Sequence, residues 1–239
     1  MKKVLNEIVG LAKWLPLCLP YRLSVLLNLP ARMQVALMPP TRKPFIVKVA
    51  VSRVVLETKD KHRFPHLRFC WPGDWDREFT RPICSLDEPN DKSSPFHQDF
   101  ETIRQVCRDG ELLRDVEEYR LMLVAVRRGE NPRGCSTQDD VACYFDTLCR
   151  VSASIQSEGY KTSAELGGLE RDEVSVWITR YGDFVYGGWA NHRLALAMLH
   201  GIDQLPVSIL GAHPEWLERV CLQMSLPPHQ ALRQWAEQL

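Results

Sequence analysis

The sequence predicts an α+β protein in which a small mixed β-sheet packs against helices and follows a largely helical N-terminal extension. Helical and β-branched patterns alternate closely between residues 136 and 213. A further helical pattern covers residues 99–128, upstream of that alternation. We therefore expect an extension over 1–135 with one strand, a long loop and helices. A unit over 136–213 then holds the sheet, and C-terminal helices over 214–239 pack on it.

The first 30 residues are apolar but are interrupted by charges and prolines. Lys13 and Arg22 break the apolar run, and three prolines limit any helix to well below the roughly 20 apolar residues that cross a bilayer. We expect no transmembrane segment here. The apolar side chains either pack on the domain or contact a partner or a membrane surface.

The rest of the extension contains one predicted strand, one loop and helices. The stretch FIVKVAVSRVVLE, residues 45–57, is rich in β-branched residues and alternates in part, which predicts a strand. Residues 64–95 are rich in Pro, Asp, Asn and Ser, which predicts a long loop. The helical pattern that follows is interrupted near Asp109 and Gly110 and ends at RRGENPRG.

Caps, breaks and periodicity define the elements of the 136–213 unit. Ser136 followed by Asp139 predicts a helix start, and Gly159 predicts the end of that helix. EVSVWITR and FVYGG predict two strands joined by a turn at Gly182. A helix then begins at about Asn191, and LPVSIL predicts another strand. Beyond residue 213, prolines at 214 and 227–228 delimit two short helices.

Composition narrows the class of protein. The 239 residues carry 30 basic and 30 acidic side chains, so no overall field attracts nucleic acid and no nucleic-acid partner is expected. The eight cysteines include no C-x-x-C pair and no zinc-type histidine spacing. This usage indicates reduced thiols in a cytoplasmic protein.

The start of the helix near residue 191 has the features of an anion site. Helix N-termini expose unpaired N–H groups and a partial positive charge, which favour phosphate. Gly187 and Gly188 allow a ligand to approach closely, and Asn191, His192 and Arg193 supply side-chain donors. The apolar residues that follow bury the helix body and hold this opening rigidly. The structural alternative is a tight strand-to-helix turn in which Arg193 pairs with a carboxylate.

The stretch from LCRVSASIQSEGYKT to GIDQLPVSIL resembles the ParB/sulfiredoxin-like superfamily over about residues 147–210. The shared pattern is a helix, S-I followed by Gly, a strand, a G-x-H-R or G-E-R-R helix start, and Gly followed by I-P-V. Members of this superfamily bind nucleotides with the phosphates at this helix start. They include chromosome-partitioning CTPases, sulfiredoxin and small-molecule kinases that phosphorylate free serine. The resemblance implies that Asn191, His192 and Arg193 bind phosphate.

Three positions depart from the family pattern. Ala190 stands where the family has glycine before its polar cluster, which narrows the approach to the phosphates. Ala195 replaces a further arginine of the partitioning proteins, which argues against their CTP switch and DNA clamp. Asn191 stands where sulfiredoxin has its catalytic cysteine, which argues against peroxide repair chemistry.

Charged residues elsewhere supply candidate catalytic and binding groups. Asp74 and Asp76, in WPGDWD, could hold Mg²⁺ on a triphosphate or act as a general base. The structural alternative is an Asp-capped turn with Trp75 in the core. In EGYKTSAE, Lys161 is a candidate phosphate ligand and Glu165 a candidate proton acceptor. Both also suit a solvated surface.

These patterns predict a nucleotide-phosphate-binding protein, and more specifically an ATP- or ADP-dependent phosphotransferase that uses Mg²⁺ and acts on a small hydroxyl compound. The residues assigned to catalysis are Asp74, Asp76 and Glu165. Those assigned to phosphate binding are Gly187, Gly188, Asn191, His192, Arg193 and Lys161. One alternative is a non-catalytic, nucleotide-responsive binding module. Another is a ParB-like nucleic-acid enzyme, against which the neutral charge argues.

Overall fold

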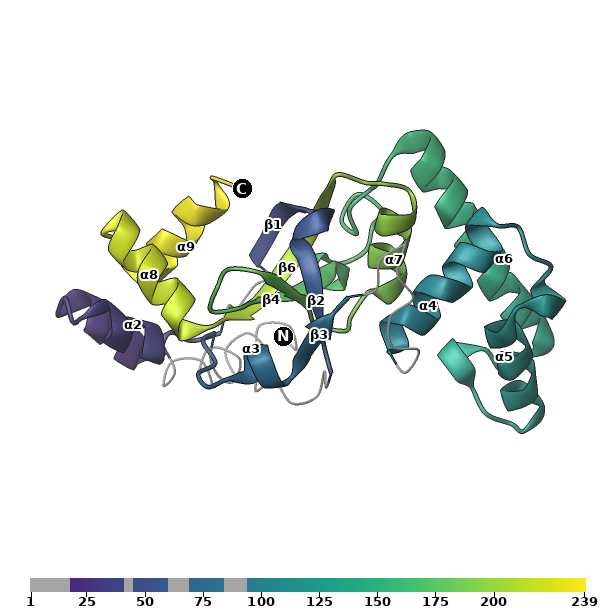
Figure 1. The fold of residues 1–239 in the computed structure, drawn as a ribbon, viewed down its shortest axis with the longest axis horizontal. Coiled ribbons are helices and arrows are strands. Elements are labelled where there is room, and N and C mark those ends of the chain that lie inside the picture. The colour runs from purple at the N-terminus through teal and green to yellow at the C-terminus, as the bar shows by residue number, and fades with distance from the viewer. Residues whose placement is uncertain (1–17, 41–44, 60–68, 84–93) are drawn as a thin grey trace, which may run out of the picture.

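The computed structural model describes residues 18–40, 45–59, 69–83 and 94–239 (Figure 1). The first 17 residues of the apolar N-terminus lie outside the described residues, as do residues 64–68 and 84–93 of the predicted 64–95 loop. Among the described helices, none combines the length and the apolar character that crossing a bilayer requires.

The protein is a mixed α/β structure built on a six-stranded sheet of strand order β1-β6-β4-β5-β2-β3. β6 pairs antiparallel with β1 and parallel with β4, β5 pairs antiparallel with β4 and parallel with β2, and β3 pairs antiparallel with β2. The strands are β1 (Phe45–Ala50), β2 (Val54–Thr58), β3 (Thr80–Pro82), β4 (Val174–Ile178), β5 (Phe184–Tyr186) and β6 (Gln204–Ala212). The predicted strands of the 136–213 unit therefore form β4, β5 and β6.

The N-terminal part contributes more to the sheet than the sequence predicts. The single strand expected over 45–57 is two strands, because the 3₁₀ turn Val51–Arg53 separates β1 from β2. β1 then pairs with β6, whereas β2 pairs with β5 on the other side of β4. With β3, the region 45–82 supplies half of the strands, so the expectation that the extension contains one strand is wrong.

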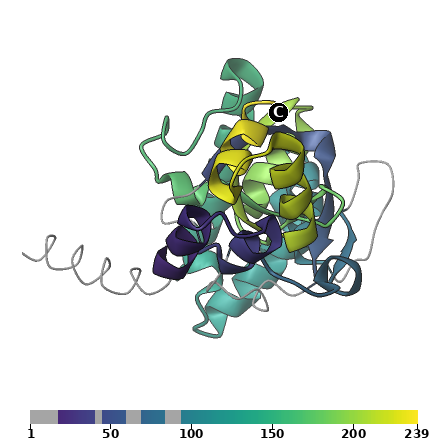
Figure 2. The ribbon, with the colours of Figure 1, turned by 90° about the vertical axis from the view of Figure 1, so that its left-hand side faces the viewer.

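Helices flank this sheet at both ends of the long axis (Figure 1). Residues 18–26 are helical, α2 packs on α8 and α9, and α4 packs beside α7. In Figure 2, α2, α8 and α9 lie in front of the sheet. The labelled helices are α2 (Ala31–Leu37), α3 (Trp75–Glu78), α4 (Pro95–Ile103), α5 (Glu117–Arg127), α6 (Gln138–Glu158), α7 (Asn191–Leu199), α8 (Pro214–Met224) and α9 (Pro228–Ala236).

Local signals place most helix ends. Gly159 follows α6 with a positive φ of 82°, and α8 begins at the predicted Pro214. The start of α6 differs by one residue from the prediction. Thr137, not Ser136, is the N-cap, and its side chain and that of Asp140 form a capping box.

The core lies between the sheet and its helices, and α7 is buried within it. Leu194, Ala195 and Ala197 have no exposed surface, and every residue of β4 is buried. A second apolar cluster forms between α5 and α6 and includes Val116 and Phe145. Residues on both sides of position 135 therefore share one core.

We predict that Leu194→Ala lowers the free energy of unfolding by about 2–5 kcal/mol, because it leaves a cavity where α7 packs on the sheet. The control is Leu121→Ala on α5, where the leucine is 57% exposed and the expected change lies within about 0.5 kcal/mol. Urea unfolding of both variants measures the difference. Equal effects would show that α7 is not buried as described.

Candidate functional site

The turn that leads from β5 into α7 needs both of its glycines. The Gly187 amide donates to the Ser175 carbonyl over 2.7 Å, and a Cβ on Gly187 would lie 3.1 Å from that oxygen and 3.2 Å from Leu210. Gly188 has a φ of 86°, a conformation that side chains disfavour. The glycine pair therefore sets the path of the chain into α7.

The N-terminus of α7 lacks a side-chain cap. Ala190 is the N-cap residue and is left-handed, with a φ of 65°, which costs a non-glycine residue about 1–2 kcal/mol. The Ala190 carbonyl is the first acceptor of the helix, and the amides of Arg193 and Leu194 both donate to it. Within the described part of the chain, no group accepts from the amides of Asn191 and His192. These two N–H groups remain available to an anion.

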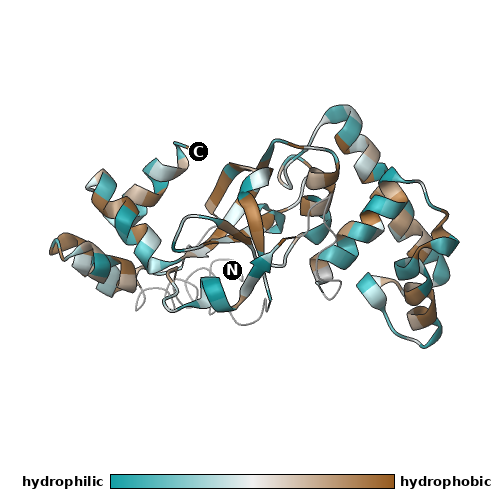
Figure 3. Cartoon of the chain, viewed as in Figure 1, coloured by the Kyte–Doolittle hydropathy of each residue, from teal (hydrophilic) through white to brown (hydrophobic). Residues whose placement is uncertain are grey.

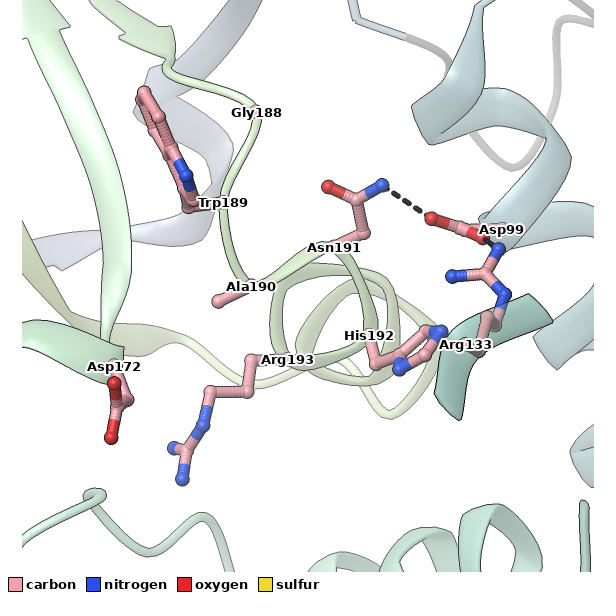
Figure 4. A pocket seen from close by; sticks show the side chains of 9 residues that line it. All are labelled: Asp99, Arg133, Asp172, Gly188, Trp189, Ala190, Asn191, His192 and Arg193. Atoms are coloured by element: carbon pink, nitrogen blue, oxygen red, sulfur yellow. Dashed lines mark hydrogen bonds and ion pairs between the residues drawn. The ribbon is translucent and has the colours of Figure 1, made fainter. Parts of the chain in front are cut away.

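A pocket of about 410 Å³ opens at this helix start (Figure 4). Its lining residues are Asp99, Arg133, Asp172, Gly188, Trp189, Ala190, Asn191, His192 and Arg193. Arg133 and Asp99 lie on one side of the α7 start, and Arg193 and Asp172 lie on the other (Figure 4). Trp189 is 39% exposed and does not close the pocket. The helix amides thus lie between two guanidinium groups.

Both the oxygen and the nitrogen of the Asn191 side-chain amide form a hydrogen bond within the protein. Its Oδ1 accepts from the Tyr186 hydroxyl, and its Nδ2 donates to the Asp99 carboxylate. Asp99, which is 5% exposed, also pairs with Arg133. Burial, together with the nearby charge of Asp99, raises the pKa of Tyr186 and keeps its hydroxyl protonated as a donor. In this structure Asn191 connects β5 to α4, and one of its two side-chain N–H donors is already used by Asp99.

His192 points toward α6 rather than into solvent. Its Nε2 lies 2.8 Å from the Tyr144 hydroxyl in a hydrogen bond. Burial lowers the pKa of His192, and the negative charge of Asp99, which raises it, does not reverse this effect. The ring is therefore neutral near pH 7. Burial raises the pKa of Tyr144 to about 12, so the hydroxyl keeps its proton. His192 therefore adds no charge to the pocket.

Arg193 is held by the segment that follows α6. Its Nη1 donates to the Tyr160 hydroxyl over 2.9 Å and to the Lys161 carbonyl over 3.3 Å, and it lies 3.4 Å from Glu173 Oε2. This contact with Glu173 is the carboxylate pairing that the structural alternative predicts. Among the described residues, every hydrogen bond and ion pair of the Arg193 side chain uses Nη1, and the side chain keeps 24% of its surface exposed. The rest of the guanidinium faces the pocket.

The other predicted site residues lie outside the pocket lining. Lys161 pairs with Glu158 on the surface, although its carbonyl contacts Arg193. Glu165 accepts from the amide and hydroxyl of Thr162, both over 2.7 Å, which closes a local turn. These contacts match the solvated-surface alternative for both residues.

Asp74 and Asp76 bind Arg180 at the β4–β5 turn. Arg180 contacts both Asp76 oxygens over 2.8–3.1 Å, and its Nη2 lies 2.6 Å from Asp74. Burial opposes ionisation of Asp76, but the Arg180 hydrogen bonds outweigh it and lower the Asp76 pKa. This turn and the α7 start lie at opposite ends of β5, which separates them by about 10 Å. The structure does not bring these carboxylates to the pocket, and their pairing is structural.

Three residues of the pocket lining are not predicted from the sequence: Asp99, Arg133 and Asp172. Asp99 belongs to α4 and Arg133 to the 3₁₀ turn Pro132–Gly134, where its φ is 51°. Asp99 reaches the pocket because α4 packs beside α7, a contact between segments about 90 residues apart, and Arg133 is held there by its ion pair with Asp99. The left-handed conformation of Arg133, a non-glycine residue in NPRG, could not be predicted from the residue types around it.

Comparisons of the chain with protein-family models, with curated proteins and with solved structures gave no match. The fold and the site therefore define this chain as a mixed α/β protein with a polar pocket at one helix start.

We predict that Asp76→Ala lowers the free energy of unfolding by about 3–5 kcal/mol, because it leaves the Arg180 charge, only 10% exposed, without its main partner. The control is Asp74→Ala, where the carboxylate is 56% exposed and the expected loss is about 0–1 kcal/mol. Chemical unfolding provides the comparison. A catalytic role for Asp76 would instead show as lost activity with unchanged stability.

Proposed function

We propose that the α7 pocket binds the phosphates of a nucleotide. The observation that carries the proposal is the pair of unpartnered amides at Asn191 and His192, held at the start of a buried helix between Arg133 and Arg193. Such amides are already aligned, so an anion pays little ordering cost when it binds. The resemblance to the ParB/sulfiredoxin-like superfamily supports the same location for the phosphates.

Two guanidinium groups suit a ligand with more than one phosphate. Nη1 of Arg193 bonds the segment between α6 and β4, whereas Nη2 and Nε have no acceptor among the described residues. Arg133 already pairs with Asp99 and, over 3.1 Å, with Glu118. A phosphate that binds Arg133 therefore competes with these two carboxylates for the guanidinium group. We expect Arg193 to contribute the larger share of affinity.

The finer proposal is phosphoryl transfer from ATP or ADP to a small hydroxyl compound. The acceptor oxygen forms a bond to the terminal phosphorus, the bond from that phosphorus to the bridging oxygen breaks, and the shortened nucleotide leaves. The Asp99 carboxylate, at the pocket wall, takes the proton of the acceptor hydroxyl. Mg²⁺ commonly binds through one or two carboxylates and substrate phosphates, and Asp172, on the opposite side of the α7 start from Asp99, is the carboxylate that would hold it.

A nucleotide-responsive binding module is the second candidate, and the pairing of Asp99 favours it. Asp99 accepts from Arg133 and Asn191 at once, so it holds α4, the 3₁₀ turn and α7 together. A phosphate that draws Arg133 away would loosen this contact and change the packing of α4. In this case the ligand alters conformation and no group is transferred. Under either candidate, a cytoplasmic location stays a prediction.

We predict that Mg·ATP and pyrophosphate raise the melting temperature of the wild type and do not raise that of Ala190→Asp. Asp tolerates the left-handed conformation, and its carboxylate would repel an anion at the α7 amides. A ligand at 100 times its Kd stabilises the folded protein by about 2.7 kcal/mol. Each kcal/mol raises the melting temperature of a chain of this size by roughly 2–4 °C. Thermal-shift assays measure this change.

The matched control is Ala190→Asn, which has nearly the same shape without the charge and should keep the ligand response. Arg193→Gln should weaken it. Absence of any shift in the wild type with both ligands would overturn the phosphate-binding proposal.

We predict that Asp99→Asn abolishes phosphoryl transfer while nucleotide binding persists, because the amide cannot take the proton but still accepts from Arg133. The measurement is ADP release from ATP across a panel of small hydroxyl compounds, alongside calorimetric binding. Binding without transfer in the wild type would reject the phosphotransferase and leave the binding module.

A further inference from the structure

The helix over 18–26 and the turn after it present a row of exposed leucines. The exposed fractions are 54% for Leu19, 46% for Leu23, 80% for Leu26 and 66% for Leu27. These positions follow the spacing i, i+4, i+7 and i+8, which places them on one helix face. Met33 of α2 adds a further exposed apolar side chain at 45%. We call these five residues the leucine surface.

The opposite face of this helix is anchored to the domain. Tyr21 and Ser24 are buried, and the Tyr21 hydroxyl lies 2.8 Å from His229 Nδ1 of α9. Val35 of α2 is 1% exposed. The leucines therefore face outward because the other side of the helix is fixed. In Figure 3 the hydropathy colouring shows brown on this end of the molecule, with α2.

The sequence around the leucine surface has a strong charge asymmetry. Between Glu7 and Glu57 the chain contains seven basic residues and no acidic residue. The whole chain has no net charge, so the remainder carries the compensating negative charge. Arg22 and Arg32 are exposed in the same helical pair as the leucines. A charge difference of this kind between parts of a chain indicates an anionic partner.

We propose that the leucine surface docks on an anionic phospholipid bilayer, with the leucines in the interface and the two arginines on the lipid headgroups. Exposed leucines next to basic residues match the pattern of interfacial helices. Contact between two copies of the chain would place like charges together. Nucleic acid would use the arginines but leave the leucines in water.

Membrane docking is compatible with an open α7 pocket. The leucine surface lies at the end of the long axis formed by α2, α8 and α9, whereas α7 and α4 lie across the sheet from it (Figure 1). A docked molecule would keep the pocket accessible from solution. The proposal does not depend on the identity of the pocket ligand.

Co-sedimentation of the full chain with vesicles tests the proposal. We expect binding to phosphatidylcholine vesicles that contain phosphatidylglycerol, weak binding to pure phosphatidylcholine, and release by high salt. The double variant Leu23→Gln, Leu26→Gln should bind about tenfold or more weakly, because two leucines no longer enter the interface. Arg22→Gln should bind about fivefold more weakly.

The matched control is Leu121→Gln, Val124→Gln on α5, a pair with the same spacing and exposures of 57% and 39%, and it should bind like the wild type. Failure of the wild type to bind anionic vesicles would overturn the proposal. So would a dimer in light scattering without lipid that the Leu23→Gln, Leu26→Gln variant loses. Duplex DNA binding that depends on Arg22 but not on the leucines would replace the membrane with nucleic acid.

Discussion

The burial of α7 against the sheet is the constraint on which the site depends. The body of the helix has no exposed surface at Leu194, Ala195 or Ala197, and the Gly187 amide bonds β4 at Ser175. These contacts fix the helix start in place before any ligand arrives. Ala190 is then forced into a left-handed conformation, a strain that packing elsewhere must offset. The result is a rigid helix start at which two amides have no acceptor among the residues that the structure describes.

The two ends of β5 differ in how their charges are balanced. At the β4–β5 turn, Arg180 is enclosed by Asp74, Asp76 and the Gly73 carbonyl, so donors and acceptors match within the chain. At the α7 end, the helix amides and part of the Arg193 guanidinium lack acceptors among the described residues. A closed ion-pair network stabilises one end of the hairpin. An excess of donors at the other end favours an anion from solution.

Much of the fold could be predicted from local signals, because they act within a few residues. Gly159, Gly182 and Pro214 place a helix end, a turn and a helix start where the sequence indicates them. The pairing of β1 with β6 and of β2 with β5 could not be predicted, because it joins segments more than 120 residues apart. The same limit applies to the site. The α7 start was identified from adjacent residues, whereas Asp99 and Arg133 reach it only through tertiary packing.

The side chains of Asp76 and Asn191 have structural partners in place of the ligand contacts that the sequence predicts, and the reason is the same. Asp76 has the residue type that catalysis requires, but so does any carboxylate that satisfies a buried arginine, and sequence alone cannot show that Arg180 lies beside it. Asn191 is equally ambiguous, because an amide both donates and accepts and can therefore link Tyr186 to Asp99. Backbone amides do not have this ambiguity. Their direction is set by the helix, so the α7 opening remains the part of the site that depends least on side-chain identity.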